Sequence, residues 1–93
     1  MTEIHISLIE KALTAKGFVA QDTHHTIYWL YVDGRKRQIH TYISHGQRRA
    51  DDWLLGQMAR QLKLTKTQFL ALVECTMSGS EYVRIMRAAG HIQ

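Results

Sequence analysis

The sequence lacks proline, has one cysteine, and contains no long apolar run. The single cysteine, Cys75, excludes an internal disulfide, and its apolar neighbours Leu72 and Val73 predict a buried thiol in a reducing compartment. No stretch approaches the roughly 20 apolar residues that span a bilayer, so we expect no contact with a membrane. Acidic Glu3 comes early and no basic region precedes an apolar run, so the form of a signal peptide is missing. We therefore expect a cytoplasmic protein.

The length of 93 residues predicts a single domain, because a domain needs roughly 50 residues to enclose a core. Apolar residues make up 45% and charged residues 22%, which is typical of a globular chain and too hydrophobic for a disordered one. There is no repeat, low-complexity segment or proline-rich linker to mark a boundary. The net charge of +4 favours contact with polyanions, because basic side chains release condensed counterions when they neutralise phosphates.

The start of the sequence predicts a helix followed by a short strand. Apolar residues recur at helical spacing at Ile6, Ile9 and Leu13. They define a helix over residues 2–16, with Thr2 placed to cap its start. Gly17 supplies the left-handed residue that ends the helix, and residues 18–20 fit a short strand.

A β-hairpin is predicted next. The segments 24–32 and 35–43 are dense in aromatic and β-branched residues, and Asp33-Gly34 joins them. Asp-Gly is a strong hairpin signal, because a type I′ turn needs positive φ at both of its central residues. A two-residue turn at this position places Val32 opposite Arg35 and fixes the pairing of every later residue.

This register predicts two unlike faces for the hairpin. The mostly apolar face, expected to lie under helices, pairs Leu30 with Arg37, Tyr28 with Ile39, Thr26 with Thr41 and His24 with Ile43. The other face pairs Tyr31 with Lys36, Trp29 with Gln38, Ile27 with His40 and His25 with Tyr42. Because rings can stack on unpaired bases and cations neutralise phosphates, this second face suits single-stranded RNA. The alternative is that its aromatic residues serve strand packing and that C-terminal helices cover it.

Three helices are predicted after the hairpin. The first spans residues 49–63, on an apolar stripe formed by Leu55, Met58, Ala59 and Leu62. The segments Thr65–Gln68 and Ser78–Glu81 fit the capping box and predict the starts of the second and third helices. The order is α, β, β, β, α, α, α, which is an α+β domain with a three-stranded antiparallel sheet.

The six histidines raise metal binding and proton transfer as candidate chemistries. On a strand, His24 and His25 point to opposite faces, and no cysteine pair or carboxylate completes a site around His25 and His40, so we expect no metal. RNA carries its own nucleophile in the 2′-hydroxyl. A histidine that titrates near neutrality can take that proton, or supply one to the leaving oxygen, without a cofactor. His25 is the preferred acid or base, with His40 as its partner on the same face.

A series of short motifs matches a known family in order. They are Gly17-Phe18, Asp22–Tyr28 with its two histidines, Asp33–Arg37 and Ser44–Gly46. In these motifs the chain resembles the HicA toxins. The resemblance implies a small fold similar to the double-stranded-RNA-binding domain, metal-independent mRNA interferase activity, and a HicB antitoxin as partner. It places His25 on the catalytic histidine of the family and residues 53–64 on its closing helix.

The resemblance covers residues 1–64, and residues 65–93 extend beyond it. Asp22-Thr23 stands where the family has Gly-Ser. The extension has three candidate roles, namely to cap the sheet, to form a homodimer contact or to dock a partner.

The combined prediction is RNA binding or cleavage, in which His25 and His40 transfer protons. The residues expected to hold the RNA are Trp29, Tyr31, Arg35, Lys36, Arg37 and Tyr42. The alternative is a non-catalytic module that binds nucleic acid through the fold, or a protein through its C-terminal helices.

Overall fold

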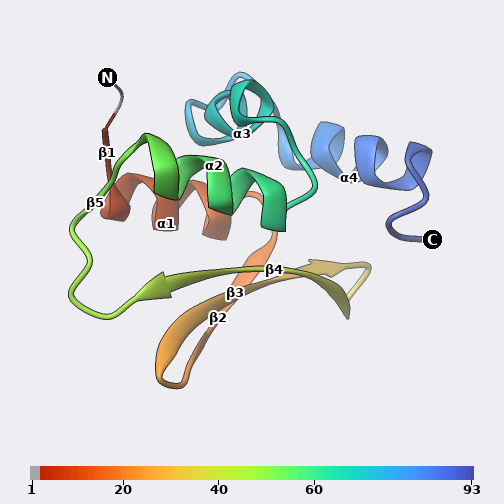
Figure 1. Cartoon of the computed structure of the whole chain (residues 1–93). Helices are drawn as coiled ribbons and strands as arrows, with labels where there is room; N and C mark the ends of the chain where they lie inside the picture. Colours follow the sequence, from red (N-terminus) through yellow and green to blue (C-terminus); the bar gives the residue numbers. More distant parts are fainter. Residues whose placement is uncertain (1–2) are drawn as a thin grey trace.

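The computed structural model describes residues 3–93, in which four helices lie on one side of a three-stranded antiparallel sheet (Figure 1). The strands are β1 (Ile4–His5), β2 (Phe18–Asp22), β3 (His25–Val32), β4 (Arg35–Ser44) and β5 (Arg49–Ala50). The helices are α1 (Ile6–Ala15), α2 (Asp52–Gln61), α3 (Lys66–Val73) and α4 (Gly79–Ala88). This order confirms the α+β class, with one helix before the sheet and three after it. None of the helices in residues 3–93 has the length and apolar character needed to cross a bilayer.

The first and second helices both begin later than predicted, for one reason. Ile4–His5 and Arg49–Ala50, which the sequence pattern places in helices, instead pair as a short antiparallel ladder of β1 with β5. Periodicity cannot separate a two-residue strand from an adjoining helical turn. Thr2, the predicted cap of the first helix, lies outside the described residues.

The remaining helix ends follow local sequence signals. Gly17, with φ of 99°, follows α1 as predicted. Thr65 and Gln68 form the reciprocal capping box of α3, and the Ser78 hydroxyl accepts the Glu81 N–H at the start of α4. At α2 the cap is a residue that the sequence did not single out, because the Asp51 carboxylate accepts the Leu54 N–H at 2.9 Å.

The prediction of a buried thiol is wrong, since Cys75 is exposed. Its apolar neighbours belong to α3, which ends at Val73, so their burial does not extend to the cysteine. Cys75 has a φ of 66°, in the left-handed region, and its Sγ lies 3.3 Å from the Nζ of Lys16. Cys75 is therefore not a residue of the core.

The hairpin is confirmed, but its register changes part-way along. Val32 pairs with Arg35 and Tyr31 with Lys36 as predicted; beyond them Trp29 pairs with His40, Tyr28 with Thr41, Thr26 with Ile43 and His25 with Ser44. The predicted pairing beyond Tyr31 is therefore wrong. Between the two regions β3 has one residue, Leu30, whereas β4 has residues 37–39. The shift is thus two residues, and because side chains alternate with a period of two, each one stays on its predicted face.

The hydrophobic core lies between the inner face of the sheet and the helices, and it includes the C-terminal extension. Phe69, Tyr82 and Met86 of α3 and α4 belong to the same buried cluster as Leu30 and Ile39 of the hairpin. In residues 3–93 no helix lies over the outer face of the sheet (Figure 1). The alternative in which the C-terminal helices cover that face is therefore wrong.

Tyr82 anchors the extension to the rest of the core. Its side chain is fully buried, its ring centroid lies 5.7 Å from that of Phe18, and its hydroxyl donates to the Leu62 carbonyl oxygen at 2.8 Å. Burial raises the pKa of the Tyr82 phenol, so the group stays protonated and remains a donor. Through this contact α4 also satisfies a carbonyl at the end of α2.

Replacing Tyr82 with phenylalanine is expected to lower the free energy of unfolding by about 1–2 kcal/mol, because the Leu62 carbonyl would stay buried without its donor. Urea denaturation measures the change. Tyr31→Phe is the matched control, since the Tyr31 hydroxyl has no hydrogen bond within residues 3–93. Equal stability of Tyr82→Phe and the wild type would show that this bond does not anchor the extension.

Candidate nucleic-acid interface

The outer face of the sheet, which we call the open face, is formed by alternate residues of three strands that point away from the helices. These are Val19 and Gln21 of β2, His25, Ile27, Trp29 and Tyr31 of β3, and Lys36, Gln38, His40 and Tyr42 of β4. Large apolar and aromatic side chains remain accessible on it, with Val19 50%, Tyr42 42% and Tyr31 37% exposed. Apolar and aromatic side chains gathered on one exposed face are typical of binding surfaces, so the open face is a candidate binding site.

Five side chains of the open face contact one another in sequence, and we call them the aromatic row. The Lys36 Nζ lies 4.1 Å from the centroid of the Trp29 ring. The Trp29 ring lies 4.3 Å from that of His40, which lies 5.1 Å from that of Tyr42. The Tyr42 ring meets that of His25 edge-on at 6.4 Å. The row therefore runs across β3 and β4 from the turn toward the other end of the hairpin.

His40 is held by hydrogen bonds at both ring nitrogens. Its Nδ1 lies 3.2 Å from the Gln38 carbonyl oxygen, and its Nε2 lies 2.9 Å from the Tyr42 hydroxyl. A carbonyl oxygen can only accept, so Nδ1 carries a proton. In the neutral ring Nε2 is then the acceptor, and the Tyr42 phenol donates to it. The register shift adds a third contact, because it places His40 opposite Trp29, where the two rings pack at 4.3 Å.

The ring of Trp29 packs against its neighbours in the aromatic row and leaves little free surface for stacking. It is half-buried, with Lys36 and His40 both against its ring, and its Nε1 donates to the Gln21 side-chain oxygen at 2.9 Å. The rings that offer open surface are those of Tyr31, Tyr42 and His25. A base that stacks on this face would meet these rings first.

The predicted site residues are not all brought together. By the alternation of side chains along β4, Arg35 and Arg37 belong to the face of the sheet that the helices cover. Of the three residues 35–37, only Lys36 lies on the open face. Arg37 is half-buried and its Nη2 donates to the Val32 carbonyl oxygen at 3.3 Å, while its Nε is buried without a partner in residues 3–93. Arg35 is exposed beside the turn, at the edge of the sheet.

The two candidate catalytic histidines share the open face, with Tyr42 between them in the aromatic row. His25 is exposed, and its imidazole forms no hydrogen bond or ion pair with the described residues. Over the same residues, 3–93, no group of three His, Cys, Asp or Glu side chains is placed to hold a metal. Imidazole and phenol groups such as those of His25, His40 and Tyr42 are able to exchange protons.

Sequence reasoning missed two parts of this region. The Tyr42 to His40 hydrogen bond depends on both residues lying on one face of a single strand, a spacing of two that the sequence does contain. The second is the exposed segment 45–49, which lines a shallow hollow beside the sheet. Its sequence signal is Arg48-Arg49, shortly after a glycine.

Comparisons with family models, with curated proteins and with solved structures found no match for this chain. The likeness to HicA toxins therefore rests on the short motifs and on their order.

In the neutral form of His40 the proton is expected on Nδ1, because the Gln38 carbonyl can only accept a hydrogen bond. Nitrogen NMR of the imidazole rings distinguishes the two tautomers. The ring of His91, which is exposed and has no hydrogen bond within residues 3–93, is the internal comparison. A neutral His40 protonated on Nε2 would contradict this arrangement of the aromatic row.

Proposed function

We propose that the chain is a HicA-like protein that binds single-stranded RNA on the open face and cleaves it without a metal. The observation that carries the proposal is the aromatic row, which is built of rings and a cation and is left uncovered by all four helices. Messenger RNA as the substrate would place the protein in the cytoplasm. A HicB-like antitoxin would then inhibit it by covering the open face.

Binding would combine stacking with charge neutralisation. Tyr31, Tyr42 and His25 present ring surface to solvent, and one stacked base contributes about 1–3 kcal/mol. Lys36 adds a cation at the turn end of the aromatic row, within a chain of net charge +4. The bases of a duplex are already stacked on one another, so this surface favours an unpaired strand.

Cleavage would use the nucleophile that RNA supplies. The 2′-hydroxyl attacks the adjacent phosphorus, and the bond to the 5′-oxygen of the next nucleotide breaks. One histidine takes the hydroxyl proton and another protonates the leaving oxygen, which gives a 2′,3′-cyclic phosphate and a 5′-hydroxyl end. We assign His25 to one of these roles, because it is exposed and its imidazole is free of bonds to described residues. His40 is the second participant, linked to the Tyr42 phenol.

One observation favours a second candidate, a binding module without catalysis. Both nitrogens of His40 are already hydrogen-bonded within the strand, and its ring packs on Trp29. These contacts suit a residue that holds its neighbours in place. In that case the open face would bind RNA and leave it intact.

The wild type, His25→Ala and His40→Ala are to be incubated with labelled single-stranded RNA in EDTA, and both cleavage and retention are scored. We expect the wild type to produce cyclic phosphate ends. His25→Ala should lose about 100-fold or more in cleavage rate, because one proton-transfer group is gone, while most of its RNA affinity remains. His91→Ala, which removes an exposed histidine of the C-terminal end, is the control and should cleave normally.

Each other result has a distinct meaning. Retention without cleavage by all proteins would replace the ribonuclease with the binding module. Cleavage by His25→Ala at the wild-type rate would remove His25 from the mechanism. If the wild type neither retained nor cleaved the RNA, the result would contradict the proposed function.

A further inference from the structure

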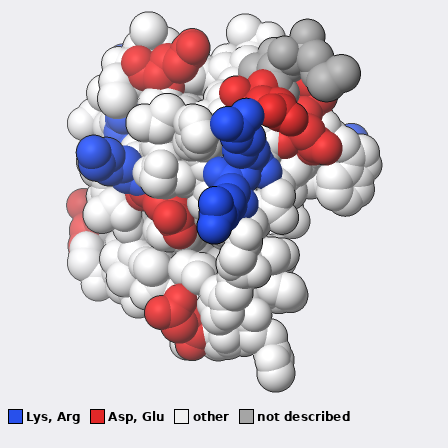
Figure 2. All heavy atoms as spheres, turned by 90° about the vertical axis from the view of Figure 1, so that its left-hand side faces the viewer, with Lys and Arg blue, Asp and Glu red and all other residues white. Residues whose placement is uncertain are grey.

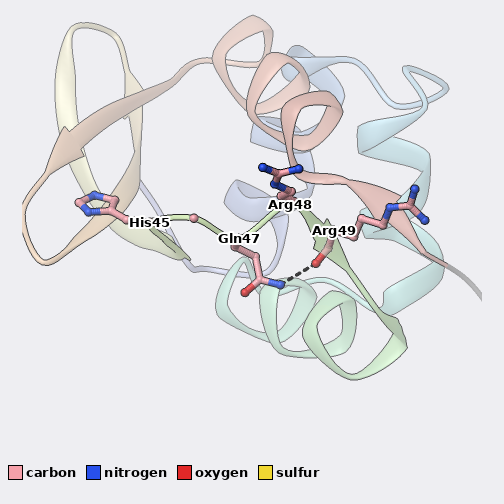
Figure 3. A pocket seen from close by; sticks show the side chains of 5 residues that line it. His45, Gln47, Arg48 and Arg49 are labelled. Atoms are coloured by element: carbon pink, nitrogen blue, oxygen red, sulfur yellow. Dashed lines mark hydrogen bonds between the residues drawn. The ribbon is translucent and has the colours of Figure 1, made fainter.

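A basic hollow continues from the His25 end of the open face. Ser44, the last residue of β4, pairs with His25, and the segment 45–49 follows it directly. This segment lines a shallow, open hollow of about 580 Å³. In Figure 3, His45 lies toward the hairpin, and Arg48 lies between His45 and Arg49. A strand that leaves the open face at His25 would therefore meet this hollow next.

The charge of the hollow is only partly neutralised. Arg49 lies 3.3 Å from Glu3 in an exposed ion pair, and the His45 Nε2 lies 3.9 Å from the Asp22 carboxylate. Arg48 is exposed, and its guanidinium has no hydrogen bond or ion pair with residues 3–93. Figure 2 faces this side of the molecule and shows Lys and Arg side chains gathered in a patch, with acidic side chains beside it. Among the described residues 45–49, Arg48 is thus the cation that a ligand can reach without displacing an ion pair.

The backbone that carries the two arginines is held on both sides. The Arg48 carbonyl accepts the Ile6 N–H at 2.9 Å, and Arg49 pairs with His5 in the β1–β5 ladder. The Gln47 side chain donates to the Arg49 carbonyl at 2.7 Å, drawn as the dashed line in Figure 3. A guanidinium that projects from a fixed backbone loses less freedom when it binds, and its planar donors match phosphate oxygens.

We propose that the hollow at residues 45–49 is a phosphate-binding extension of the RNA site, in which Arg48 is the principal ligand and Arg49 and His45 assist. It deepens the proposed function and rests on it. The hollow is lined by His45, Gly46, Gln47, Arg48 and Arg49, and none of these offers the broad ring surface of tyrosine or tryptophan. It would therefore hold the sugar–phosphate backbone without reading bases. RNA that extends past the open face gains affinity from the hollow, whereas RNA confined to the aromatic row does not.

The test compares two uncleavable 2′-O-methyl oligonucleotides, of about five and about twelve nucleotides, by fluorescence anisotropy over a series of salt concentrations. Arg48→Gln is expected to weaken binding of the longer RNA about tenfold and to reduce its salt slope by about 0.7, which is the loss of one phosphate contact on a single strand. Its binding of the shorter RNA should match that of the wild type. Arg84→Gln removes an exposed arginine of α4 and should leave both affinities unchanged within about twofold.

Two further variants separate this inference from the proposed function. Arg48→Lys keeps the charge and should recover most of the lost salt slope but less of the affinity. Tyr42→Ala should weaken the binding of both RNAs, because it removes an exposed ring of the open face. If Tyr42→Ala weakens the binding of both RNAs and Arg48→Gln weakens the binding of neither, the hollow is not a phosphate site, whereas the open face remains the RNA site. Equal loss on both RNAs with Arg48→Gln would also overturn the extension, and no binding of either RNA by the wild type would overturn both proposals.

Discussion

Burial of one face of the hairpin under all four helices is the constraint on which the rest of the molecule depends. Tyr28, Leu30 and Ile39 point inward and share a single core with α1, α2 and the two C-terminal helices. Because neighbouring side chains of a strand alternate, the residues between them must point outward. The outward side chains do not pack in the core, so core packing does not restrict which residue types occupy these positions. Rings, histidines and a lysine occupy these positions.

The aromatic row gives this outward composition a fixed geometry. Lys36, Trp29, His40 and Tyr42 already contact one another without a ligand, and Gln21 and Gln38 hold two of the rings by hydrogen bonds. A surface whose rings are already ordered loses less side-chain entropy when it binds a strand. Beside it, the hollow at residues 45–49 carries charge and little ring surface. Exposed rings and basic side chains thus lie on adjacent parts of one surface.

The class of fold and the faces of the hairpin could be predicted from the sequence, because alternation survives a shift of two residues. The register beyond Leu30 could not, since nothing at residues 37–39 signals the irregularity there. For the same reason the contact of His40 with Trp29 was missed. The exposure of Cys75 could not be predicted, because the residue lies in a turn after α3. The apolar pattern of the sequence does not show that this helix ends at Val73. The hollow depends on the β1–β5 pairing of distant residues, which a single sequence does not reveal.

The most direct test of the central claim is an NMR titration of the whole protein with a short, uncleavable single-stranded RNA. If the open face binds RNA, the largest shifts will fall on the Trp29 indole N–H, on the rings of His25, His40 and Tyr42, and on outward residues of β3 and β4. The indole N–H of Trp53, which is 71% exposed on α2, will stay in place. Shifts confined to α3 and α4, or no shifts at saturating RNA, would contradict the account.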